Sequence, residues 1–209
     1  MRVQQIASTV MLVAVACGGS PAPTGQPAPT AQPAPTATVT TPTSQAAADG
    51  ALTPLPDGTL PRMFTAEQLR AAMPVGHRLR LRMEAAGAPV IEERWLVTAA
   101  DAETCTIASQ AYDPDGKLVR DDGAATSAWK ELREHGAVPA VGTEVSRATI
   151  EVPAGRFDTQ VYRVTTRDAQ GRVTVKVMHF ALTLPGPPVL MTVERDGQQL
   201  LRMTLLERR

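Results

Sequence analysis

The spacing of apolar residues over residues 61–209 predicts two short helices separated by strands. Thr65 and Gln68 fit a helix-capping box at the start of the first helix. Leu69 and Met73 lie four residues apart, so they share one face of it, and Pro74 ends it. The sequence therefore predicts a short amphipathic helix before the first strand.

A second helix is predicted over residues 126–136, with Thr126 or Ser127 as the capping residue. Trp129 and Leu132 are three residues apart and should face the sheet.

Apolar and polar residues alternate with a period of two in the remaining stretches, a pattern typical of half-buried strands. Nine strands are expected, at residues 77–84, 90–98, 104–112, 118–119, 145–152, 157–166, 172–181, 189–194 and 199–206. These elements predict an α+β domain over residues 61–209. We expect a strongly curved, mainly antiparallel sheet, a half-barrel, with the two helices against its concave face.

Turn residues between these strands predict how neighbouring strands pair. A turn at residues 86–89 should place Trp95 among buried leucines. A four-residue loop at 168–171 should place Arg163 and Lys176 together on the polar face, and an odd-length loop with Gly197 should close the last hairpin. The predicted pairs are Met83–Ile91, Leu79–Trp95, Arg82–Glu92, Val164–Val175, Tyr162–Val177, Met191–Leu201 and Val189–Met203.

Three arginines, Arg78, Arg80 and Arg82, alternate on the polar face of the first strand. They are compatible with an anion site or with an ordinary solvated face. We favour the solvated face because we expect Glu92 and Glu93 of the next strand to sit opposite the arginines.

The first seventeen residues have the pattern of a targeting signal. One positive charge at Arg2 precedes an uncharged, mostly apolar stretch over residues 6–16, which is too short to span a membrane. This stretch ends in Ala14-Val15-Ala16-Cys17, which resembles the lipobox of bacterial lipoproteins. The resemblance implies a signal peptide at residues 1–16 and a lipid on the Cys17 thiol, although that family usually has Leu where Ala14 stands. An ordinary secretory signal cut nearby is the alternative.

Two or three acyl chains would hold the protein on a membrane, because each buried CH₂ contributes about 0.8 kcal/mol. In lipoproteins of double-membraned bacteria, Asp after the modified Cys favours the inner membrane. This chain has Gly18 there, so the resemblance implies the outer membrane, facing the periplasm or the cell surface.

Residues 17–60 form a Pro/Ala/Thr-rich segment with the imperfect repeat PAPTGQ, PAPTAQ, PAPTAT. Such a composition cannot bury enough apolar surface to offset its ordering entropy, so we expect a disordered spacer. A site for a proline-recognition partner is the alternative, and the lack of charged residues beside the prolines disfavours it.

Charge and composition exclude several classes of function. The chain has 21 basic and 21 acidic residues, which argues against a nucleic-acid partner. If Cys17 is lipidated, Cys105 is the remaining thiol, and its strand context predicts a buried side chain. The segment Asp113-Pro114-Asp115-Gly116-Lys117 differs from a calcium loop because Lys117 replaces an oxygen ligand. We expect a turn there.

The histidines, at 77, 135 and 179, form none of the HxH, HExxH or Cys/His patterns of metal sites. Ser127, His135 and Asp121 or Asp122 form a nominal catalytic set of a kind that any chain of this size offers. We therefore expect no catalytic residue, no metal and no cofactor, and we do not expect an enzyme.

The segment Val152-Pro153-Ala154-Gly155-Arg156-Phe157, followed by Leu184-Pro185-Gly186 and a closing hairpin, resembles the end of a group of uncharacterised bacterial lipoproteins. These are similar to the lipoprotein carriers LolA and LolB, so the resemblance implies a half-open barrel with an apolar cavity.

Three functions remain open. The first is a non-catalytic binding or structural domain, anchored to the cell envelope, with an unknown protein partner. The second is a carrier or sensor of a hydrophobic or lipid ligand, which requires a pocket of at least about 300 Å³. The third is an envelope hydrolase, which requires convergent titratable groups in one cleft.

Overall fold

The computed structural model describes residues 52–209. The predicted signal peptide, Cys17 and the linker up to residue 51 lie outside the described residues. The described chain folds into a mainly β unit with nine strands and two short helices, as the sequence predicts. In chain order the elements are α1 (Ala66–Ala72), β1 (Arg78–Ala85), β2 (Ile91–Ala100), β3 (Thr104–Tyr112), β4 (Leu118–Ala128), α2 (Trp129–Glu134), β5 (Thr143–Val152), β6 (Gly155–Arg167), β7 (Val173–Ala181), β8 (Leu190–Arg195) and β9 (Gln198–Arg208).

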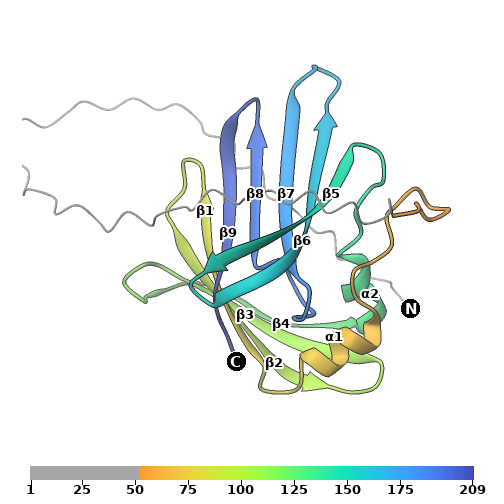
Figure 1. Cartoon of the computed structure of the whole chain (residues 1–209). Helices are drawn as coiled ribbons and strands as arrows, with labels where there is room; N and C mark the ends of the chain where they lie inside the picture. Colours follow the sequence, from red (N-terminus) through yellow and green to blue (C-terminus); the bar gives the residue numbers. More distant parts are fainter. Residues whose placement is uncertain (1–51) are drawn as a thin grey trace, which may run out of the picture. The chain divides into compact units, whose positions relative to one another are not determined.

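All nine strands belong to one antiparallel sheet in the order β4-β3-β2-β1-β9-β8-β7-β6-β5. Pairing of β1 with β9 joins the first four strands to the last five. Figure 1 shows β7, β8 and β9 side by side, with β2, β3 and β4 running across them at a large angle. The β5–β6 hairpin crosses in front of this sheet (Figure 1).

The predicted half-barrel is wrong in one respect, because the sheet is not strongly curled or closed. A half-barrel buries one face of every strand, whereas β6 changes its buried face between Val161 and Tyr162. Tyr162 packs with residues of both helices in one hydrophobic cluster. Phe157 packs against a second cluster, which includes Leu79 and Leu81. Strand β6 therefore contributes to both clusters, and the sheet does not wrap around a single interior.

The first helix forms as the sequence predicts. The Thr65 hydroxyl accepts a hydrogen bond from the Gln68 N–H, and the Gln68 side chain accepts one from the Thr65 N–H. Leu69 and Met73 are both buried and pack with Phe64 in the first cluster. This reciprocal cap satisfies two N–H groups that a helix otherwise leaves unpaired.

The second helix starts later than predicted, at Trp129. Thr126 and Ser127 belong to β4, and Ala128 takes the N-cap position. The Glu131 carboxylate accepts the Ala128 N–H at 3.1 Å, which replaces a hydroxyl cap. Trp129 and the partly buried Leu132 nevertheless pack against the sheet as expected.

The fourth strand is much longer than the predicted residues 118–119. The Asp121-Asp122-Gly123 segment makes a β-bulge, so Gln110 pairs with Asp121 while Ser109 pairs with Gly123. Gly123 has a φ of 70°, and its N–H donates to the Asp121 carboxylate. A bulge accommodates one extra residue in a strand, so this segment bends the strand without ending it.

The register of the first hairpin is the predicted one. Leu79 lies opposite Trp95, and Met83 lies opposite Ile91. Trp95 is partly buried and packs against the cluster of Leu79 and Leu81.

The β6–β7 hairpin pairs one residue out of the predicted register. Val164 faces Lys176 and Tyr162 faces Met178, because Arg172 belongs to the loop. The Asp168 carboxylate accepts the Arg172 N–H and the Arg172 Nε, which fixes the longer loop. Lys176 therefore lies on the same face as Val164, where burial lowers its pKa.

The register of the last hairpin differs from the predicted one. Asp196 and Gly197, with φ of 50° and 81°, make a two-residue turn of the kind favoured in hairpins. A bulge at Val193/Glu194 then shifts the register, so Met191 lies opposite Met203. The apolar residues share the predicted face with different partners.

Candidate functional site

His77 lies immediately before β1 and is 8% exposed. Its N–H donates to the Pro74 carbonyl, and its own carbonyl accepts the Val97 N–H. Its Nε2 atom has no hydrogen-bond partner among residues 52–209. Burial lowers the pKa of His77, and the Arg208 charge lowers it further. Burial at this position therefore disfavours the charged form of the imidazole.

Arg208 is half-buried at the end of β9, and burial lowers its pKa. Its guanidinium donates to the Ala72 carbonyl at 2.9 Å and to the Pro185 carbonyl at 3.1 Å. Ala72 is the last residue of α1, and cations are favourable at the negative end of a helix. Arg208 thus fastens α1 and the 182–188 loop to β9.

His179 lies on β7, where it is opposite Val161 and Leu190. Its Nδ1 atom is 3.4 Å from the Thr159 hydroxyl, and burial lowers its pKa. The Thr159 hydroxyl in turn donates to the Ala148 carbonyl at 2.7 Å. This chain of contacts ties β7 to β5 through β6.

Cys105 is buried on β3 with 1% exposure, as expected. Burial raises the pKa of its thiol, so the nucleophilic thiolate is disfavoured. The Cys17 prediction lies outside the described residues.

The two aspartates of the nominal catalytic set have partners outside that set. The Asp121 carboxylate accepts hydrogen bonds from Gln110 Nε2 and the Gly123 N–H, while Asp122 pairs with Arg120. His135 is exposed at the end of α2, and Ser127 pairs with Cys105 across β3 and β4.

Asp113 makes a turn, as the sequence predicts. Its carboxylate accepts the N–H groups of Asp115 and Lys117 at 3.1 and 2.9 Å, and Gly116 has a φ of 81°. Across residues 52–209, no three His, Cys, Asp or Glu side chains form a group that could hold a metal ion.

A small pocket lies between the segment before α1, the end of α2 and strands β6 and β7. Its volume is about 40 Å³, and its walls include Phe64, Leu69, Tyr162 and Phe180, with Arg62 and Arg133 also lining it. Pockets for small organic ligands are typically roughly 300 Å³ or more. This one has room for a few water-sized groups.

Arg62 is the residue at this pocket that sequence reasoning missed. Its side chain is 12% exposed and donates to the Glu134 carboxylate, with Nε at 3.0 Å. The same carboxylate accepts from Arg133, and hydrogen bonds from Arg133 and Arg62 lower the pKa of Glu134. Arg62 and Glu134 are 72 residues apart, so no local pattern could have paired them.

The polar face of β1 and β2 carries a connected ion network. Arg80 donates to both Glu92 oxygens at 2.9 and 2.8 Å and to Glu207 at 2.8 Å. The hydrogen bonds that Glu92 accepts from Arg80 and from Arg94 lower its pKa to about 2. Arg82 lies opposite Glu92 along the backbone as predicted, yet Arg80 makes the ion pair.

Glu93 is not part of this network, contrary to the sequence analysis. It lies opposite Leu81, whose side chain is fully buried, so it projects from the other face. There Glu93 pairs with Arg120 at 2.8 Å. One of the two carboxylates expected to neutralise the arginines is therefore absent from their face.

No helix among residues 52–209 has the length and apolar character that crossing a membrane would require. Comparisons with protein-family models, curated proteins and solved structures give no match to this chain.

Proposed function

We propose that the protein is a lipid-anchored component of the bacterial cell envelope whose β domain is a non-catalytic binding or structural module. The observation that carries the proposal is the position of Cys17, directly after the apolar stretch of residues 6–16 and the small residues Ala14 and Ala16. Lipid on this thiol would hold the domain at a membrane, and the absence of Asp at position 18 favours the outer one.

The packing of the domain supports a module that acts through its surface. The groups best suited to catalysis serve the fold: His77 is buried at the start of β1, His179 contacts Thr159, and Cys105 is buried with a raised pKa. The pocket lined by Phe64, Leu69, Tyr162 and Phe180, at about 40 Å³, has itself little room for a substrate.

Acylation is tested in cells by metabolic labelling with an alkyne analogue of palmitate, followed by fractionation. We expect the native chain to be labelled and to sediment with membranes. The Cys17→Ala variant should be unlabelled and lose its stable membrane association. Cys105→Ala is the matched control, since it removes the other cysteine and should leave labelling intact. An unlabelled native chain, or a membrane-bound Cys17→Ala variant, would contradict the anchor.

Carriage of a hydrophobic ligand is a second candidate, favoured by the aromatic and aliphatic walls of the same pocket, Phe64, Leu69, Tyr162 and Phe180. It requires the pocket to widen several-fold. Native mass spectrometry after mild detergent extraction distinguishes the two candidates. Retained lipid in stoichiometric amount supports the carrier, whereas a lipid-free domain that co-purifies with a protein supports the module.

A further inference from the structure

The outer face of β1, β2 and β9 carries more arginine than acid. We call it the arginine face, and its cationic residues are Arg78, Arg80, Arg82, Arg94, Arg202 and Arg209. The carboxylates among them are Glu84, Glu92 and Glu207. Six guanidinium groups thus face three carboxylates in a domain whose whole chain has balanced charge.

Two of the three carboxylates lie deeper than the arginines that surround them. The Glu92 and Glu207 side chains are 18% and 25% exposed, whereas Arg80, Arg94 and Arg209 are 42%, 43% and 79% exposed. The carboxylates therefore orient the guanidinium groups from below. A partner that approaches this face meets cationic groups first.

Arg78 and Arg82 extend the face beyond the ion network. Both side chains are exposed, and neither has an ion-pair partner among residues 52–209. Arg94 is held by its ion pair with Glu92 and also by Tyr112, because its guanidinium lies 3.9 Å from the centre of the Tyr112 ring. The paired and unpaired guanidinium groups together make a broad cationic surface on the sheet. It is bordered by Asp121 on β4 and by Glu194 on β8.

We propose that the arginine face docks on a membrane surface rich in anionic lipid headgroups. Charge complementarity selects this partner, because each Arg near an anionic bilayer contributes attraction that falls off within a Debye length. The proposal goes beyond the proposed function, but a lipid anchor would strengthen it by keeping the domain at a high effective concentration near the bilayer.

The test uses the chain from Gly18 to Arg209, which lacks the predicted signal peptide and the acylated cysteine. Both hydrophobic clusters are built from residues 60–205, so this chain keeps all of the described packing. Co-sedimentation is measured with phosphatidylcholine vesicles and with vesicles in which about 30% of the lipid is the anionic phosphatidylglycerol. Because Cys17 is absent, the result does not depend on acylation.

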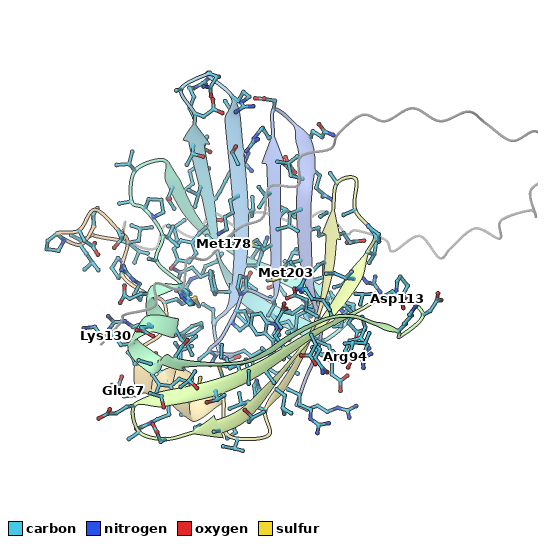
Figure 2. The ribbon with its side chains drawn as sticks, turned by 180° about the vertical axis from the view of Figure 1, so that it is seen from behind. Glu67, Arg94, Asp113, Lys130, Met178 and Met203 are labelled. Carbon is cyan, nitrogen blue, oxygen red and sulfur yellow. The ribbon has the colours of Figure 1, made fainter. Side chains whose placement is uncertain are left out.

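We expect binding to the anionic vesicles to be at least about tenfold tighter than to neutral ones and to weaken steeply with added salt. The Arg78→Glu/Arg82→Glu variant should lose this preference. Lys130→Glu/Arg156→Glu makes the same change of charge elsewhere and should keep it. Figure 2 shows Lys130 on α2 well away from Arg94 on the arginine face.

Equal binding to both vesicle types would overturn the proposal, as would equal losses in the two double variants with unchanged unfolding midpoints. Binding to a soluble polyanion such as heparin, without binding to anionic vesicles, would also overturn it and assign the face to a polymer.

Discussion

Met203 on β9 lies directly opposite Met83 on β1, at the pairing that joins the two halves of the sheet. Met203 also lies opposite Met191 on β8, and Met191 lies opposite Met178 on β7. Four methionines thus form one row across four neighbouring strands. Met178 belongs to the cluster under the helices, Met203 belongs to the other cluster, and Met191 packs against both. Flexible thioether side chains suit the irregular space where two cores meet.

Met203→Ala should destabilise the domain by about 2–4 kcal/mol, since a buried Met loses its contacts and leaves a cavity. Met203 is 6% exposed, and both neighbours in its row would lose packing. Urea unfolding measures the change in the free energy of unfolding. Leu118→Ala, at a side chain that is 45% exposed, is the control and should change stability by less than about 1 kcal/mol. Similar losses in both variants would contradict a structural role for the row.

Gly142→Ala should be far more damaging than Gly87→Ala. Both residues have a positive φ, 75° and 74°, so alanine pays a similar backbone penalty at each site of about 1–2 kcal/mol. At Gly142 a Cβ would also overlap the Thr165 carbonyl oxygen, whereas at Gly87 it would meet nothing within 4 Å. The clash adds roughly 1–3 kcal/mol at Gly142. Thermal unfolding of the two variants provides the comparison, and equal midpoints would show that the close approach carries no energy.

Local signals in the sequence were sufficient for α1 and for the first hairpin. Thr65 and Gln68 define a cap through neighbouring atoms, and the alternation of Leu79, Leu81 and Met83 leaves one register that buries all three. The strand pairing of the last hairpin was predicted wrongly, because this hairpin contains a bulge. At Val193/Glu194 the chain keeps a favourable two-residue turn and corrects its register by a bulge, a compromise between turn and core that no short window reveals.

The surroundings of the candidate site residues depended on long-range contacts. His77 is buried immediately before β1, and Arg208, whose charge adds to the lowering of its pKa by burial, lies 131 residues further along the chain. The sequence showed that Glu93 follows Glu92, and strand alternation alone would have put the two on opposite faces. That error concealed the excess of arginine on the outer face.

Cys105 should be protected from thiol reagents in the folded protein. Its side chain is 1% exposed and its pKa is raised, so modification requires local opening of β3. In the Gly18–Arg209 chain, where it is the single cysteine, we expect reaction with a disulfide reagent to be at least about 100-fold slower in buffer than in urea. A Thr126→Cys/Cys105→Ala variant places the thiol on the exposed face of β4 and should react quickly. Rapid reaction of native Cys105 would mean that β3 opens readily.

Stability should fall as the pH drops from 7.5 to 5.5. Burial lowers the pKa of His77 and of His179 from the ordinary value of 6.5, so the unfolded chain takes up protons at a higher pH than the folded chain. Below pH 6.5 the unfolded state binds more protons, and the free energy of unfolding decreases. At pH 5.5 the loss is at most about 1.4 kcal/mol per histidine.

The carboxylates act in a separate range of pH. The pKa of Glu92 is lowered from 4.5 to about 2, so its stabilising contribution is fully present above pH 4.5 and is lost as the pH falls toward 2. Urea unfolding at pH 7.5 and 5.5 therefore isolates the histidines. The His77→Gln/His179→Gln variant should lose less stability over this interval than the native chain. His135→Gln, at the exposed end of α2, should lose as much as the native chain. If the free energy of unfolding fell equally in the double variant and in the His135→Gln control, protonation of the buried imidazoles would not be the cause of the pH dependence.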